Sequence, residues 1–120
     1  MITNTFRDSL MLVHFDEFRE LLYKIEDIKA EQKTLSRRVK KPILTYTAYQ
    51  MHKQIAEPLR RIFNSRKYSH QTCVDKFTDA LRKLHQLIRE LADYGRDALA
   101  KTLQDLYQRL FALLPEQTVI

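Results

Sequence analysis

Four histidines and one cysteine are the side chains of this chain best suited to metal binding or nucleophilic catalysis. The histidines are His14, His52, His70 and His85. None has an acidic residue three positions before it, the Glu-x-x-His spacing of di-iron sites in helical bundles. The single cysteine, Cys73, stands beside an apolar valine, and we interpret it as a small buried residue rather than a reactive thiol. These residues predict no metal site and no catalytic pair.

Sequence motifs of enzymes and nucleotide-binding loops are also missing from the chain. It contains no G-x-S-x-G and no H-E-x-x-H motif. A loop that cradles phosphates needs several glycines, and the chain has one. The sequence therefore predicts a protein that is not an enzyme and that holds no cofactor.

Phosphate recognition is the chemistry that the charged residues do suggest. Residues 33–67 contain ten lysines and arginines and one acid, a net charge of +9. Residues 1–32 carry a net charge of −3, and residues 68–120 are neutral. Such segregation indicates that a polyanion or an acidic partner lies against one region.

The basic side chains of this segment form two clusters joined by Lys53, at opposite ends of a predicted helix roughly 33 Å long. A track of that length suits a nucleic-acid backbone. Tyr46 and Tyr49 lie among these charges in the sequence. Single-stranded bases stack on aromatic side chains that stand beside basic ones, so these two tyrosines are the candidates for stacking. The residues predicted to contact phosphates are Arg37, Arg38, Lys40, Lys41, Lys53, Arg60, Arg61, Arg66 and Lys67.

Three alternatives to this interpretation stay open. The same charges suit an acidic protein partner, in an adaptor, chaperone or inhibitor. They also suit simple solvation, because cations near a helix C-terminus interact favourably with the helix dipole. The acidic residues of the segment 16–31 suggest, finally, that a neighbouring copy of the chain binds the basic segment head to tail.

Apolar residues spaced by threes and fours predict a long amphipathic helix over residues 5–39. Thr5-x-x-Asp8 resembles a capping box that opens it, and His14 falls on its apolar seam. Pro42 predicts its end, because proline restricts the preceding residue and lacks an N–H.

A second apolar stripe predicts a helix over residues 43–63, followed by a polar loop over residues 64–69. Pro58 falls inside this helix and predicts a kink or a restart near Glu57.

Two further stripes predict helices over residues 72–94 and 96–114. Thr72 begins another capping-box pattern and is predicted to open the third helix. Gly95 is predicted to end it, although one continuous helix through that residue is the alternative.

These stripes predict an all-α, up-and-down four-helix bundle in a single domain over residues 1–120, with residues 116–120 as a loose tail. One glycine and three prolines are too few for the regular turns of a sheet protein. Wide apolar stripes favour self-association, so we expect a homo-oligomer. A single cysteine, no signal-peptide pattern and no apolar run of membrane-spanning length predict a cytoplasmic protein without membrane contact.

The pattern over residues 45–114 resembles a family of short basic helical proteins. A Thr-led helix begins at Thr47, an Arg-Lys-Tyr-Ser loop follows at residues 66–69, and a Leu/Arg-rich helix spans residues 81–92. A last helix carries Tyr-Gln-Arg-Leu at residues 107–110. This layout is similar to the accessory variability determinants of diversity-generating retroelements and to the related ribosomal intervening-sequence proteins.

The resemblance implies a ring-like homo-oligomer that binds RNA or DNA and assists a reverse transcriptase without catalysis of its own. It assigns no site residues, so the candidates rest on the charge argument. Together these observations predict a non-enzymatic nucleic-acid-binding bundle that contacts RNA or DNA backbone through residues 33–67.

Overall fold

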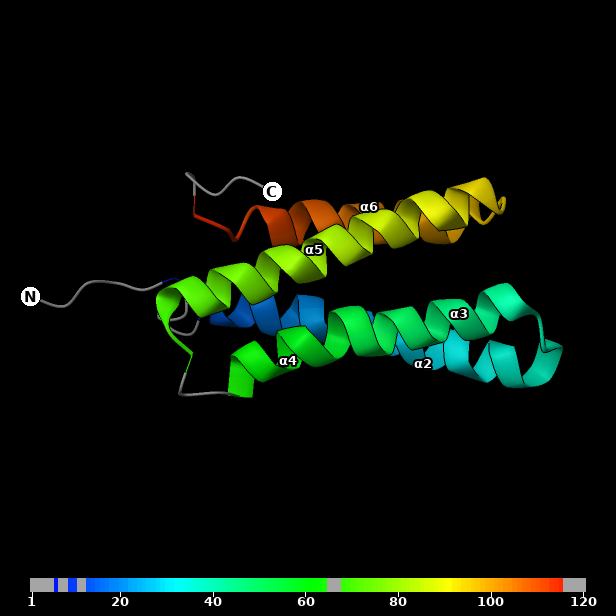
Figure 1. Ribbon diagram of the computed structural model, residues 1–120, viewed down its shortest axis with the longest axis horizontal. Coiled ribbons are helices and arrows are strands. Elements are labelled where there is room, and N and C mark those ends of the chain that lie inside the picture. The colour runs from blue at the N-terminus through cyan, green and yellow to red at the C-terminus, as the bar shows by residue number, and fades with distance from the viewer. Residues whose placement is uncertain (1–5, 7–8, 11–12, 65–67, 116–120) are drawn as a thin grey trace, which may run out of the picture.

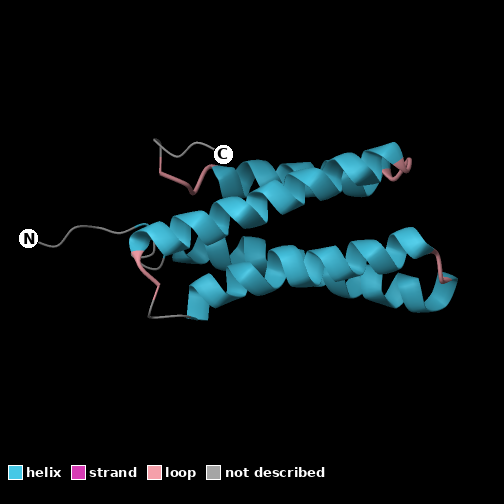
Figure 2. Cartoon of the chain, viewed as in Figure 1, coloured by secondary structure: helices cyan, strands magenta, loops and turns pink. Residues whose placement is uncertain are grey.

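Helices that run back and forth along one axis make up the chain, and they confirm the predicted all-α four-helix bundle (Figures 1 and 2). The computed structural model describes residues 6, 9–10, 13–64 and 68–115, and no strand occurs among them. The bundle is elongated, with principal extents of 55 × 24 × 21 Å. Its helical elements in chain order are α2 (Phe15–Val39), α3 (Pro42–Gln50), the π-helix η1 (Met51–Ala56), α4 (Glu57–Asn64), α5 (His70–Asp93) and α6 (Asp97–Phe111).

Helix α2 begins ten residues later than the sequence predicted, because the chain turns at Val13 and His14. The backbone N–H groups of both residues donate to the carbonyl of Ser9, each at 2.9 Å, so the helical ladder is interrupted there. His14 is therefore the N-cap of α2 and not a residue of its apolar seam. The predicted cap at Thr5 and Asp8 lies outside the described residues.

The reason for this turn lies in the core around Phe77 of α5. The ring of Phe6 packs edge-on against Phe77 with centroids 5.2 Å apart, and Phe18 of α2 packs against the same ring at 6.0 Å. All three side chains are buried. In a straight helix Phe6 and Phe18, twelve residues apart, would be separated by about 18 Å along the axis, so packing of both rings on Phe77 favours the turn.

The second helical stretch is continuous through α3, η1 and α4, and it changes register before Pro58. Proline has no N–H, and in a regular α-helix its ring meets the carbonyl four residues earlier. The six-residue π-helix precedes it directly, and the N–H of Glu57 donates to the carbonyl of His52, five residues back. The α-helical register resumes at Glu57, which confirms the predicted restart. The π-helical geometry was not predicted.

Helix α5 begins two residues earlier than predicted, because Ser69 and not Thr72 is its N-cap. The Ser69 hydroxyl accepts a hydrogen bond from the Thr72 N–H at 3.1 Å, and it donates to the Thr72 hydroxyl at 2.9 Å. Serine satisfies one of the free N–H groups of the first turn in this position. The predicted cap, Thr72, is therefore wrong, because it lies three residues inside the helix that Ser69 opens.

Gly95 separates α5 from α6, as predicted. The N–H of Arg96 donates to the Leu91 carbonyl at 2.9 Å, and that of Gly95 donates to the Ala92 carbonyl at 3.0 Å. This pair of bonds defines a Schellman motif, whose left-handed residue is Gly95 with φ +78°. The Arg96 guanidinium then donates to the buried side-chain oxygen of Gln32 at 2.7 Å and connects the start of α6 to α2.

Apolar side chains of all four helical stretches meet in one core, from Phe18 on α2 to Leu110 on α6. Among the described residues, no helix is both long enough and apolar enough to cross a membrane. The predicted tail over residues 116–120 lies outside the described residues.

Candidate nucleic-acid interface

The connection between α2 and α3 brings four of the predicted cations to one end of the bundle. Arg37 and Arg38 occupy the last turn of α2. Lys40 ends that helix in the left-handed conformation, with φ 57°, and its N–H donates to the Ser36 carbonyl at 3.0 Å. Lys41 is extended before Pro42, the first residue of α3. We call these four residues the hairpin cluster: Arg37, Arg38, Lys40 and Lys41.

The hairpin cluster is exposed, and none of its members forms an ion pair within the described part of the chain. Their surroundings in the sequence explain this, because residues 32–56 contain six cations and no aspartate or glutamate. Unpaired cations gathered at one end produce a positive potential that attracts anions.

A groove between α2 and α3 continues the positive surface of the hairpin cluster. It has a volume of 340 Å³ and carries no carboxylate in its lining. We call it the basic groove. Its lining residues are Lys29, Lys33, Ser36 and Arg37 from α2, Thr45, Ala48 and Tyr49 from α3, and His52 from η1.

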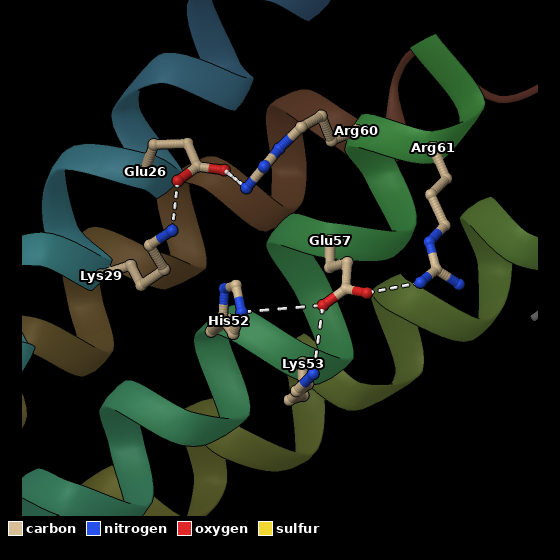
Figure 3. Close-up of polar contacts among 7 residues, drawn as sticks. All are labelled: Glu26, Lys29, His52, Lys53, Glu57, Arg60 and Arg61. Atoms are coloured by element: carbon tan, nitrogen blue, oxygen red, sulfur yellow. Dashed lines mark hydrogen bonds and ion pairs between the residues drawn. The ribbon is translucent and has the colours of Figure 1, made fainter. Parts of the chain in front are cut away.

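The cations of the basic groove lie on one face of α2, because Lys29, Lys33 and Arg37 are spaced by four residues. Lys29 forms an ion pair with Glu26, with 2.5 Å between the ammonium nitrogen and a carboxylate oxygen (Figure 3). Lys33 and Arg37 are exposed and have no ion pair among the described residues. The groove therefore offers two uncompensated cations to a ligand.

His52 of the π-helix lies where the basic groove meets the second basic cluster, whose described members are Lys53, Arg60 and Arg61. Its Nε2 lies 3.6 Å from a carboxylate oxygen of Glu57, as Figure 3 shows. Its Nδ1 is buried and has no hydrogen-bond partner in the described ranges, a condition that native proteins rarely leave unexplained. π-Helical segments such as η1 are frequent at functional sites.

The second basic cluster differs from the first, because acidic residues compensate it. Arg61 donates to Glu57 at 2.6 Å, and Lys53 lies 3.6 Å from the same carboxylate (Figure 3). Arg60 donates to Glu26 of α2 at 2.7 Å. The remaining two candidates of this cluster, Arg66 and Lys67, lie outside the described residues.

The pKa values of these carboxyl groups reflect the pairing. Lys53, followed by Arg61 and His52, lowers the pKa of Glu57 below its usual 4.5. Burial acts to raise the pKa of Glu26, but hydrogen bonds from Lys29 and Arg60 outweigh it and lower the pKa. Both carboxylates therefore hold their negative charge firmly beside the second cluster.

The two candidate tyrosines have different surroundings. The Tyr46 hydroxyl donates to the Glu90 carboxylate of α5, which raises the pKa of Tyr46. Tyr49 is 56 % exposed and lines the basic groove, and it has no ring contact or hydrogen bond within the described ranges. Tyr49 is thus the tyrosine whose ring is open to a ligand.

The structure brings Arg37, Arg38, Lys40, Lys41 and Tyr49 together at one end of the bundle. It places Lys53, Arg60 and Arg61 further along the second helical stretch, beside Glu57 and Glu26. The sequence analysis did not assign the groove residues Lys29, Lys33 and His52 to the site. The four-residue spacing from Lys29 to Arg37 was the available signal, but the opposite wall of the groove depends on how α3 packs.

The other histidines and the cysteine lie outside this surface. His70 Nδ1 accepts a hydrogen bond from the Phe6 N–H at 2.7 Å, and the His85 ring packs on Tyr107 at 5.5 Å. Cys73 is buried. No group of three metal-ligating side chains occurs among the residues described.

Comparisons of the chain with family models, curated proteins and solved structures give no match. The interpretation of this surface therefore depends on its own geometry and charge.

Proposed function

We propose that this bundle binds the backbone of RNA or DNA at the end formed by the hairpin cluster and the basic groove, without catalysis of its own. The observation that carries the proposal is the absence of acids over residues 32–56, which leaves five exposed cations unpaired at that end: Lys33, Arg37, Arg38, Lys40 and Lys41. Cations that only solvate a helical surface are usually mixed with acids, as on α5 and α6 of this chain.

The second basic cluster contributes less in this proposal than the sequence suggested. Lys53, Arg60 and Arg61 each lie within 4 Å of a carboxylate, and a phosphate must compete with that carboxylate for them. The predicted track along the whole helix therefore becomes a site at one end with weaker contacts beyond it.

The salt dependence of binding tests the proposal. Each neutralised phosphate releases counterions, so log K falls with log salt by about 0.7 per contact for single strands and about 0.9 for B-DNA. A variant with Gln at Arg37, Arg38, Lys40 and Lys41 is expected to bind more weakly and to lower this slope by about 3. Fluorescence anisotropy with labelled RNA and DNA, at several salt concentrations, measures both quantities.

A matched control removes four exposed or half-exposed cations that have no ion pair in the described structure: Arg82, Lys83, Arg89 and Lys101. Gln at these positions gives the same change of net charge on α5 and α6. We expect a smaller loss of affinity and a nearly unchanged slope. Equal effects of the two variants, or no effect of the first, would overturn the proposed site.

An acidic protein partner is the competing outcome of the same test. Such a partner predicts no binding to generic RNA or DNA even at low salt. The family resemblance over residues 45–114 supports the nucleic-acid proposal and also implies a ring-like homo-oligomer, which light scattering after size-exclusion chromatography tests.

A further inference from the structure

The basic groove has the size of a small-molecule site and two chemically different walls. Its 340 Å³ lies at the lower end of the range of such sites, roughly 300–1,000 Å³. Lys33 and Arg37, one helical turn apart, line the α2 wall, and Tyr49 lines the α3 wall. Ala48, next to Tyr49 on the α3 wall, adds only a small side chain to the lining. One wall therefore attracts an anion, and the other presents an aromatic face.

The charge of the groove restricts what it can bind. Among its lining residues Lys29 is neutralised by Glu26, whereas Lys33 and Arg37 keep their full charge. The hydroxyl of Ser36 donates to the Lys33 carbonyl at 2.8 Å, so toward a ligand its oxygen can act only as an acceptor. The ligand that fits is anionic and has hydrogen-bond donors or an apolar face beside its charge.

The exposure of Tyr49 indicates what that apolar face is. A tyrosine that is 56 % exposed and in contact with no other ring of the described structure has a free π-surface. Nucleobases stack on such surfaces, and each stacked base contributes about 1–3 kcal/mol to binding of single strands by alanine substitution. A base in a duplex is already stacked on its neighbours, so its faces are not free to stack on Tyr49.

We propose that the basic groove is a subsite for one unpaired nucleotide, whose base stacks on Tyr49 and whose phosphate binds Lys33 and Arg37. This inference rests on the proposed function and makes it more specific, because it selects single-stranded RNA or DNA over duplexes. The hairpin cluster holds the neighbouring phosphates of the same strand. His52 of η1 also lines the subsite, beside Tyr49.

The test uses the full chain and three fluorescein-labelled probes of equal length: an intact single strand, a strand that is abasic at every position, and the duplex of the intact strand. Wild-type protein is expected to bind the intact strand most tightly. Tyr49→Ala is expected to weaken binding of that strand by roughly 5- to 150-fold. Tyr49→Phe keeps the ring and is expected to bind like wild type.

The abasic strand and the duplex are expected to respond little to Tyr49→Ala, because neither offers a base to stack. Tyr23→Ala is the matched control, since Tyr23 is 60 % exposed on the acidic part of α2, away from the groove. Both tyrosines are exposed, and urea denaturation checks that the variants keep the stability of the wild type.

Two results separate the failure of this inference from that of the proposed function. If the hairpin cluster governs the salt slope but Tyr49→Ala leaves single-strand binding unchanged, the nucleotide subsite is wrong and the backbone interface stands. If wild-type protein binds none of the three probes at low salt, both are wrong. Equal losses of single-strand and duplex affinity in Tyr49→Ala would also overturn the stacking role.

Discussion

At the scale of single residues, Lys40 combines two properties that a substitution can separate. It supplies a charge to the hairpin cluster, and its backbone has φ 57°, a left-handed conformation that costs an L-residue about 1–2 kcal/mol. Glycine adopts this conformation without that cost but loses more entropy on folding. Lys40→Gly is therefore expected to raise the free energy of unfolding by about 0.5–1 kcal/mol and to weaken nucleic-acid binding.

Urea denaturation and anisotropy measure these two effects of Lys40→Gly on the same sample. Lys41→Gln is the control, because it removes the same charge from a residue whose backbone is already extended. It is expected to weaken binding without the gain in stability. A Lys40→Gly protein that is less stable than wild type would contradict the strain argument.

Some properties of the individual candidate residues were predictable from the sequence, where the composition of the neighbouring segment determines them. Arg37, Arg38 and Lys41 are exposed and unpaired because no acid lies near them in the chain. The pairing of Arg60 with Glu26 was not predictable, because it joins residues 34 positions apart that meet only when α4 packs on α2. The basic groove was not predictable for the same reason, because α2 supplies one of its walls and α3 supplies the other.

At the scale of elements, Gly95 determines where α5 ends and α6 begins. A Cβ at this position meets nothing within 4 Å, so a side chain causes no clash there. The φ of +78° nevertheless strains any L-residue. Gly95→Ala is expected to lower the free energy of unfolding by about 1 kcal/mol, as urea denaturation measures. Gly95→Asn is expected to lose less, because asparagine tolerates the left-handed region.

Equal losses in the alanine and asparagine variants of Gly95 would mean that the backbone conformation is not the cause. The opposite alternative, a helix continuous through residue 95, predicts that Gly95→Ala is more stable than wild type, because alanine is the better helix former.

The element boundaries that the sequence predicted well are those that a residue's own backbone imposes. Pro42 begins α3 because its ring fixes φ and removes the N–H, and Gly95 ends α5 because glycine adopts φ +78° without strain. The break at Val13–His14 was not predicted, because periodicity continues through it while the direction of the chain changes. The π-helix was not predicted either. Pro58 predicts that the pattern of backbone hydrogen bonds is interrupted, but it does not predict which geometry the helix adopts there.

At the scale of the whole molecule, the two ends of this 55 Å bundle use their cations differently. Away from the hairpin, arginines connect helices: Arg60 reaches from α4 to Glu26 of α2, and Arg109 reaches from α6 to Glu17 and Glu20 of α2. At the hairpin end, Arg96 also connects α6 to Gln32 of α2, but the four cations of the hairpin cluster have no ion pair among the described residues. Lys33 and the hairpin cluster thus leave five positive charges without an ion pair in the described part of the chain, available to a partner.

Ion pairs within α2 and between α2 and its neighbours make the stability of the whole bundle depend on pH. Lys24 and Arg109 lower the pKa of Glu20, and Lys29 and Arg60 lower the pKa of Glu26 despite its partial burial. A carboxyl group with a lower pKa in the folded state binds fewer protons there than in the unfolded chain. Its stabilising contribution is therefore complete above the unfolded value of about 4.5 and is lost as pH falls through the folded pKa.

We accordingly expect the urea midpoint to be constant between about pH 7 and pH 6 and to fall progressively below about pH 5. Glu26→Gln removes one of these groups, so its midpoint is expected to be lower than that of wild type at pH 7 and to approach it at about pH 3. Glu31→Gln is the control, because Glu31 is exposed and has no ion pair in the described part of the chain. Two results would show that these ion pairs do not stabilise the fold. One is a wild-type urea midpoint that rises on acidification. The other is a difference in midpoint between wild type and Glu26→Gln that is the same at about pH 7 and about pH 3.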